Sequence, residues 1–353
     1  MDGKGWGMPA EWEAHTGCWI GWPYRSDNWR QAAGPAQRAF ATVVKAIAQF
    51  EHVTVGARAE EVQAAKLQLG AEAQIVVIPF DDAWFRDTGP TFVRARDGTV
   101  AGVDWDFNAY GGLYPDYEQD KLIASNILKA AGVQRLPCPL VLEGGSIHVD
   151  GQGTLLTTEE CLLNTAGRVR NPDLSRAQIE GLLRQMLGVR KIIWLPRGLY
   201  ADEDTNGHVD NFACFAAPGK VLLAWTDDES DPQFERSCEA LKILQSETDA
   251  QGRRLKVTKL HLPDPLFRTA EELPVCEGDH TREAGERLAA SYVNFYIANG
   301  GIVMPAFGQE PADSRAWNTL VKTFPNRKVV SVPTREILLG GGNIHCITQQ
   351  QPM

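Results

Sequence analysis

The sequence lacks the features that mark membrane, secreted and zinc-finger proteins. No apolar run reaches the length of a membrane-spanning helix. Residues 1–17 (MDGKGWGMPAEWEAHTG) have neither the apolar core of a signal peptide nor the Arg- and Ser-rich pattern of a transit peptide. No two of the seven cysteines form a CxxC pair, which argues against structural zinc. We therefore expect free thiols, a cytoplasmic location and no membrane partner.

Positive charge is also scarce. Lys and Arg number 35 against 45 Asp and Glu, for a formal net charge of −10, and the basic residues are spread along the chain. This balance argues against nucleic acid or an anionic membrane as a partner and suits a cationic ligand. No low-complexity segment or linker divides the chain, so we expect residues 1–353 to form a single domain.

The chain instead contains a repeat of β-hairpins. Alternating or β-branched runs turn back on themselves around Asp, Asn, Gly or Pro-Gly, which is the usual hairpin pattern. Four such hairpins are predicted, at 89–105, 144–158, 207–225 and 291–307. Each predicts one half-buried pair of strands.

Helical patterns separate these hairpins. The segment 35–50 places Phe40, Val43, Val44 and Ile47 on one face. The segment 171–188 is predicted to begin at a capping Asn171 and to end at a glycine. The other predicted helices are 115–132, 231–252 and 313–325.

Two strands remain without a hairpin partner, at 16–23 and 340–348. If they pair with each other, they complete a fifth unit and close the chain into a ring. The predicted fold is α/β, a five-bladed propeller of ββα or ββαβ units with pseudo-fivefold symmetry. The alternative is a plain α/β protein whose hairpins merely look alike.

Polar residues lie where the inner strands of this ring begin. They are Asp87, Glu143, the pair His208 and Asp210, and the pair His345 and Cys346. On strands, His208 and Asp210 would share a face, whereas His345 and Cys346 would point opposite ways. The blades of a propeller converge on its axis, so we expect a nucleophile, an acid/base and carboxylates to meet there.

Carboxylates beside a thiol oppose its ionisation, because like charges raise the pKa of the thiol. A planar cation bound by those carboxylates would cancel that penalty. Guanidinium fits, since it stays charged and forms paired hydrogen bonds with carboxylates. Trp84 could lie against its face or against an alkyl tail.

The segments that carry these residues resemble the agmatine deiminase family. They are DDAWFRDTGPTFV, LEGGSIHVDGQGTLLTTEECLLN, GHVDNFACF and GGGNIHCITQQQP, and the likeness runs from MPAEWEAHTGCWIGWP almost to the last residue. That family belongs to the guanidine-modifying superfamily of five-bladed α/β propellers, the pentein fold. The resemblance implies an active site at the central axis of the ring.

By this resemblance Cys346 is the nucleophile and His208 the general acid/base, while Asp87 and Asp210 hold the guanidinium. Glu143 positions His208 or the substrate, and His345 faces away with a structural role. The reaction converts agmatine to N-carbamoylputrescine and ammonia through a thiouronium adduct on Cys346, without a metal or organic cofactor. The resemblance also implies a homodimer or higher assembly.

Agmatine carries an ammonium where arginine also has a carboxylate. We expect an acidic side chain from ADEDTNG to bind this ammonium. Among the acidic residues of that loop, Asp204 lies nearest in sequence to His208, so we expect it to be the one. A solvated acidic loop is the alternative. Rival functions are arginine deiminase, peptidylarginine deiminase or amidinotransferase, a non-catalytic propeller, and a metal-dependent hydrolase with ligands from His208, Asp210, His345 and Cys346.

Overall fold

The computed structural model describes residues 5–163, 168–274 and 282–353. In these residues the strands form five small sheets. Four sheets share one pattern, in which an antiparallel hairpin is followed by a helix and then by a third, parallel strand. The prediction of a five-bladed α/β propeller is therefore confirmed, with the ββαβ pattern in these four blades and a fourth strand in the fifth.

These four blades follow one another along the chain. The first contains β4 (Thr91–Arg94), β5 (Val100–Asp106), α5 (Ile123–Ala131) and β6 (Gln134–Val141). The second contains β7 (Ile147–Val149), β8 (Thr154–Thr158), α7 (Arg176–Leu187) and β9 (Lys191–Leu195). The third contains β10 (Ala213–Ala217), β11 (Lys220–Trp225), α8 (Pro232–Ser246) and β12 (Lys256–His261). The fourth contains β13 (Tyr296–Ala298), β14 (Gly301–Ala306), α9 (Ala312–Thr323) and β15 (Lys328–Pro333).

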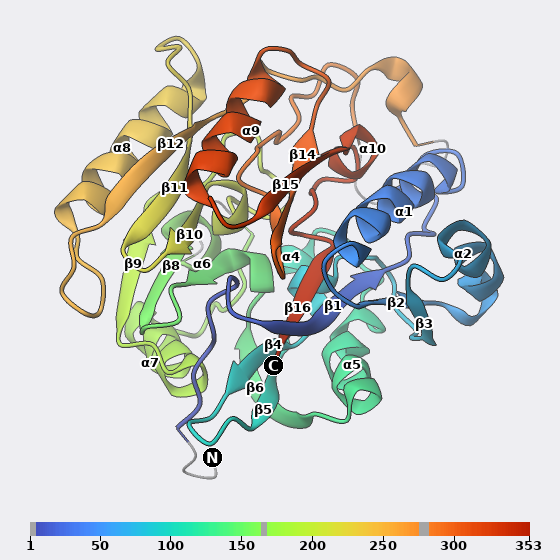
Figure 1. Cartoon of the computed structure of the whole chain (residues 1–353), viewed down its shortest axis with the longest axis horizontal. Coiled ribbons are helices and arrows are strands. Elements are labelled where there is room, and N and C mark those ends of the chain that lie inside the picture. The colour runs from blue at the N-terminus through green and yellow to red at the C-terminus, as the bar shows by residue number, and fades with distance from the viewer. Residues whose placement is uncertain (1–4, 164–167, 275–281) are drawn as a thin grey trace.

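The fifth blade joins distant parts of the sequence. Strand β16 (Thr348–Pro352) pairs antiparallel with β1 (His15–Gly21), and β2 (Val53–Ala57) and β3 (Gln74–Val77) extend the sheet in parallel. Helices α1 (Gly34–Ala48) and α2 (Val62–Leu69) connect these strands. The predicted closure of the ring is thus confirmed, and Figure 1 shows red β16 beside blue β1. The closing strand was predicted at 340–348, which was wrong, because that segment forms a turn and the strand begins only at Thr348.

The larger helices lie around the rim of the ring, outside the sheets (Figure 1). Helix α1 buries Phe40, Val43, Val44 and Ile47 completely, as their spacing predicts. Shorter helices connect other elements: α3 (Phe85–Thr88), α4 (Ala109–Gly112), α6 (Glu159–Leu162) and α10 (Arg335–Leu338). None of the helices in the described ranges is long and apolar enough to cross a membrane.

Three predicted helices differ from the observed ones at their ends. Helix α7 begins after Ser175, whose side chain forms a capping box with Gln178, whereas the Asn171 side chain bonds the backbone of Val141. The predicted helix 115–132 is regular only over α5, after a single turn at Asp120–Leu122. The predicted helix 231–252 ends at Ser246. Asn171 was the wrong cap because its amide has a tertiary partner that the sequence pattern does not reveal.

Candidate active site

Short turns, rather than the inner strands themselves, carry the polar residues of the central axis. Asp87 lies in α3, directly before β4, and Asp210 lies in a helical turn at Val209–Asn211, before β10. Cys346 lies in the turn that precedes β16. The prediction that His208 and Asp210 share one face of a strand, and that His345 and Cys346 oppose each other on another, is therefore wrong. Alternation applies only to extended backbone.

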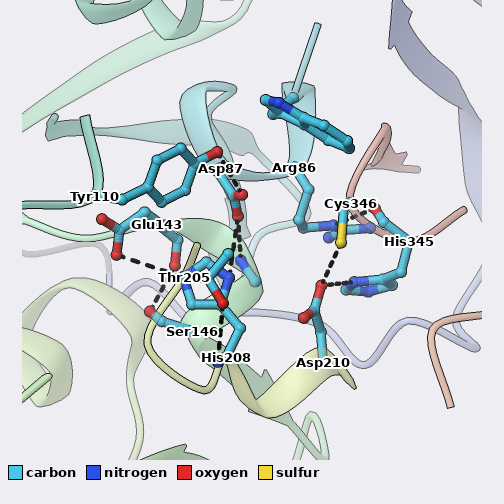
Figure 2. A network of polar contacts seen from close by, with 12 residues as sticks. Arg86, Asp87, Tyr110, Glu143, Ser146, Thr205, His208, Asp210, His345 and Cys346 are labelled. Atoms are coloured by element: carbon cyan, nitrogen blue, oxygen red, sulfur yellow. Dashed lines mark hydrogen bonds and ion pairs between the residues drawn. The ribbon is translucent and has the colours of Figure 1, made fainter. Parts of the chain in front are cut away.

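Asp87 is buried and accepts two neutral donors. The Gly145 amide donates to Oδ1 at 2.9 Å. The Tyr110 hydroxyl donates to Oδ2 at 3.0 Å, a contact that Figure 2 shows. Burial raises the pKa of Asp87 to about 6, a rise that nearby His208 opposes and that Asp210 and Glu143 add to.

Gly145 leaves the space between the axial side chains open. A Cβ atom at this residue would lie 2.7 Å from His208 Nδ1 and 2.9 Å from both Asp210 Oδ2 and Asp87 Oδ1. These three groups therefore surround one point, and only a residue without a side chain leaves it free for a ligand.

His208 is fully buried between two carboxylates. Its Nδ1 lies 3.7 Å from Asp87 Oδ1, and its Nε2 lies 3.6 Å from Glu143 Oε2. Burial lowers the pKa of His208, but Asp87, Cys161 and Glu143 outweigh it and hold this pKa well above its usual value. The two carboxylates therefore favour the imidazolium, which can act as a general acid.

Glu143 is fixed by a second charge. Arg170 Nε donates to Glu143 Oε1 at 3.0 Å, and both side chains are fully buried. Burial alone would raise the pKa of Glu143. The positive charges of Arg170 and His208 have the larger effect and lower this pKa to about 2. Glu143 therefore faces His208 as a carboxylate.

Cys346 lies beside Asp210 and Asn294. Its thiol is 3.5 Å from Asp210 Oδ2, and Asn294 Nδ2 donates to the sulfur at 3.2 Å. Burial raises the pKa of the Cys346 thiol well above its usual value, and the charges of Asp210 and Asp87 raise it further. The thiol needs a neighbouring cation to ionise at neutral pH.

His345 does not face away from the site. Its Nδ1 lies 2.8 Å from Asp210 Oδ2, the same oxygen that lies nearest to Cys346 (Figure 2). The expectation of a back-facing residue followed from the strand alternation, which does not hold in this turn. His345 contacts the site through Asp210.

A pocket leads to Cys346 from the surface. Its lining includes Trp84, Asp87, Tyr110, Asp204, Arg282 and Cys346. Gly342 keeps its inner end open, since a Cβ there would lie 2.6 Å from the Trp84 ring and 3.1 Å from Cys346 Sγ. Asp204 reaches this pocket, but its Oδ2 lies 2.7 Å from Arg282 Nη2, so it is not a solitary acidic group.

One group of side chains has the composition of a metal site. Potential ligand atoms of Glu143, Cys161 and His208 all lie within 4.8 Å of one another. The Arg170 guanidinium donates to the same Glu143 and would repel a cation there. In the described ranges, the alternative ligand set of His208, Asp210, His345 and Cys346 is not gathered within that distance.

Sequence reasoning missed four residues that contact the predicted ones. Tyr110 contacts Asp87 and Asn294 contacts Cys346, while Arg170 contacts Glu143 and Glu11 contacts His345. Asn294 could have been found from the repeat, since it is a polar residue just before the inner strand of the fourth blade, where the other blades carry Asp87, Glu143, Asp210 and Cys346. Tyr110 has no comparable signal. It reaches Asp87 from a helix-like turn in which its φ is 56°.

The chain is similar to proteins of known family along nearly its whole length. The Porphyromonas-type peptidyl-arginine deiminase family matches residues 7–352. The agmatine deiminase of Medicago truncatula is 54% identical and that of Pseudomonas aeruginosa (strain LESB58) is 55% identical, each over 99% of this chain and 96% of the relative. The solved agmatine deiminase of Enterococcus faecalis is 44% identical, with a TM-score of 0.94 over 99% of this chain and 96% of its own.

The family relationship and the site agree, because the buried thiol, the imidazolium and the paired carboxylates lie in the segments that carry the sequence resemblance. The chain belongs to the Porphyromonas-type peptidyl-arginine deiminase family and, within the pentein superfamily, to the agmatine deiminases.

Proposed function

We propose that this protein hydrolyses agmatine to N-carbamoylputrescine and ammonia, with Cys346 as nucleophile. The observation that carries the proposal is the position of the Cys346 thiol, 3.5 Å from Asp210 Oδ2 at the inner end of a pocket that Asp87 also lines. Two buried carboxylates beside a thiol suit a planar cation that carries the reacting carbon. Relatives named agmatine deiminase at 54% and 55% identity support this choice of substrate.

The first half of the reaction releases ammonia. Asp87 and Asp210 bind the guanidinium, whose charge favours the thiolate of Cys346, and the thiol releases its proton to solvent. The thiolate attacks the guanidinium carbon, and a carbon–sulfur bond forms. His208, protonated in the free protein, gives its proton to the terminal nitrogen as the carbon–nitrogen bond breaks. Ammonia departs and a thiouronium adduct remains on Cys346.

The second half releases the ureido product. His208, now neutral, removes a proton from a water molecule that attacks the adduct carbon. The carbon–sulfur bond then breaks, Cys346 leaves as a thiolate, and the hydroxyl on the carbon loses its proton to solvent as the ureido carbonyl forms. Glu143 lies 3.6 Å from His208 Nε2 and holds the ring in place through both protonation states. Water supplies the oxygen of N-carbamoylputrescine, and side chains of this protein carry each proposed step.

An ammonia-release assay on agmatine, arginine and a blocked arginyl peptide tests this function. We expect agmatine to be the preferred substrate and to release stoichiometric ammonia without a second amine. Cys346→Ala should lose roughly 10⁴-fold or more, because the covalent route disappears. Cys238→Ala is the matched control, since Cys238 lies in α8 at the rim of the ring. Near-normal ammonia release by Cys346→Ala would refute the mechanism, and ammonia release that requires a second amine would indicate an amidinotransferase.

The far end of the substrate is proposed to contact Asp204. Asp204 lines the pocket, and its partner Arg282 also lies within ion-pair range of Glu286, at 3.8 Å. Arg282 could therefore keep a carboxylate partner while Asp204 binds the ammonium. The Trp84 ring lines the same pocket and would pack on the guanidinium or the alkyl chain.

The preference between agmatine and arginine tests Asp204. Asp204→Asn should lower kcat/KM for agmatine by roughly 10-fold while changing that for arginine little, because only a charge facing the ammonium is removed. Glu203→Gln, one residue away, is the control. An unchanged agmatine-to-arginine ratio in Asp204→Asn would remove this residue from substrate binding.

We further propose that residues 1–353 form one propeller domain, that the protein assembles as a homodimer or larger oligomer, and that it works in the cytoplasm in putrescine metabolism. The pairing of β1 with β16 supports the single domain, since one sheet joins residues from both ends of the sequence. The described cysteines are all free, which suits a reducing compartment, and Cys276 lies outside the described residues. Size-exclusion chromatography with light scattering tests the assembly.

A further inference from the structure

A second set of buried charges lies behind Asp210, on the side away from the pocket. It consists of Glu11, Arg86, His148 and His345, each at most 4% exposed. Glu11 belongs to the segment before β1, whereas His345 precedes Cys346. The proposed chemistry assigns none of these four residues a role, although burying so many charges is costly unless they are paired.

His345 lies between two carboxylates. Its Nε2 is 2.8 Å from Glu11 Oε1, and its Nδ1 is 2.8 Å from Asp210 Oδ2. A neutral imidazole has one N–H and could donate to only one of them. Two carboxylate acceptors at hydrogen-bond distance therefore require the doubly protonated ring, an imidazolium.

Glu11 is held as a carboxylate by the groups around it. Arg86 Nη1 lies 3.5 Å from Oε1, and His148 Nε2 lies 3.6 Å from Oε2. The Arg86 guanidinium also donates through Nε to the His345 carbonyl at 3.3 Å. Glu11 and Asp210 thus carry two negative charges against the two positive charges of Arg86 and His345.

Asp210 uses its two oxygens differently. Oδ2 accepts from His345 and lies 3.5 Å from the Cys346 thiol. Oδ1 is buried and has no hydrogen-bond partner among the described residues. The contact with His345 therefore fixes the rotation of the carboxylate and leaves one oxygen available for an N–H group of a ligand.

We propose that Glu11 and His345 are positioning residues for this reaction: Glu11 keeps His345 as an imidazolium, and His345 orients Asp210 and offsets its charge beside Cys346. The inference rests on the proposed function for the roles of Asp210 and Cys346. Without the imidazolium, the negative charge of Asp210 acts on the sulfur uncompensated and the thiolate becomes harder to form.

The rate at which a neutral haloacetamide alkylates Cys346 measures the thiolate directly, and mass spectrometry separates this cysteine from the others. Below the pKa of the thiol, that rate falls roughly tenfold for each unit by which the pKa rises. In His345→Gln, which keeps an N–H donor but loses the charge, we expect at least that tenfold fall, with a similar loss of kcat/KM. A purely structural role for His345 would leave the pH dependence of alkylation unchanged.

Glu11→Gln tests the remote residue. Glutamine still accepts from His345 Nε2 but no longer stabilises its charge, so the alkylation rate should fall in the same direction and by less. Glu11→Asp should restore part of it. Glu13→Gln is the matched control from the same segment, because Glu13 pairs with Arg94 away from the axis. Its alkylation profile should match that of the wild type.

The pathway through Asp210 is tested by a double variant. Adding His345→Gln to Asp210→Asn should change alkylation no further, since the charge to be offset is already gone. The proposal is overturned if folded His345→Gln and Glu11→Gln alkylate with the wild-type pH profile, or if the effects of His345→Gln and Asp210→Asn add. Alkylation needs no substrate, so a failure of agmatine turnover in the wild-type protein would reject the proposed function and not this inference.

Discussion

At the scale of single residues, two aspartates in one site have opposite pKa shifts. Burial raises the pKa of both, yet that of Asp210 ends below its usual value because His345 lies 2.8 Å away. Asp87 has only neutral donors at hydrogen-bond distance and His208 at 3.7 Å, and its pKa rises to about 6. Asp87 is thus the carboxylate that titrates near neutral pH.

The pH dependence of kcat/KM should report Asp87. Above a pH of about 6 this carboxylate is ionised and attracts the guanidinium, and below it the charge is lost and binding weakens. We expect kcat/KM for agmatine to fall as the pH drops through about 6, with the acid limb of kcat at lower pH because bound substrate favours the ionised form. An acid limb of kcat/KM near 4 would contradict this assignment.

Some residues of the site could be predicted from the sequence, and others could not. The main site residues could be predicted because they are polar residues at the starts of predicted inner strands. Three of them surround Gly145 in the structure: Asp87, His208 and Asp210. Cys346 lies beside Asp210, and Glu143 lies beside His208. The Asp204–Arg282 pair and the contact of Glu11 with His345 could not be predicted. Each joins segments far apart in sequence, and no periodicity relates them.

At the scale of elements, the turns before the inner strands carry the polar side chains to the axis, a role that the sequence pattern predicted for the strands themselves. Such a turn can present neighbouring residues to one site, which explains how both His345 and Cys346 reach Asp210. Helix and strand positions were predictable because apolar periodicity extends over many residues. The turns were not, since they are only a few residues long and are determined by tertiary contacts such as the bond from Arg86 N to Cys346 O.

The turn at Gly144–Ser146 lies where the axial side chains meet. Gly145→Ala would place a methyl group within 3 Å of His208, Asp210 and Asp87, so it should lower kcat/KM by roughly 100-fold while the protein remains folded. Steady-state kinetics with circular dichroism measures both effects.

Gly181→Ala is the matched control for that change. Gly181 lies in α7 with nothing within 4 Å of the added methyl group, so alanine should preserve activity and stabilise the helix by about 0.5–1 kcal/mol. Equal activity losses in both variants would mean that crowding at the axis is not the cause of the effect at Gly145.

At the scale of the whole molecule, the ring is closed by one pair of strands. Strand β16 aligns Thr348–Gln351 with Gly17–Ile20 of β1, and it contacts β4 of the neighbouring blade. This closure was predictable from two unpaired strands, because each resembled half of a repeated unit. The order of the charged side chains around the axis was not, since it depends on how the blades rotate against one another.

Deleting residues 348–353 separates closure of the ring from the chemistry. All the proposed catalytic residues remain, but β1 loses its antiparallel partner and the buried side chains of β16 disappear. We expect loss of cooperative thermal unfolding and of turnover. Deletion of Met353 alone, which is 63% exposed, should change neither strongly. Retention of both by the longer deletion would show that the ring does not need this strand.

The position of Cys346 also has a consequence for the newly made protein. Every other proposed catalytic residue precedes it in the chain, and the sheet that holds its turn requires β16. As a ribosome synthesises the polypeptide from the N-terminus, four blades can begin to fold while the fifth still lacks its inner strand. The reactive sulfur is then the last part of the site to emerge, so a nascent chain has no agmatine-hydrolysing activity before translation of this region is finished.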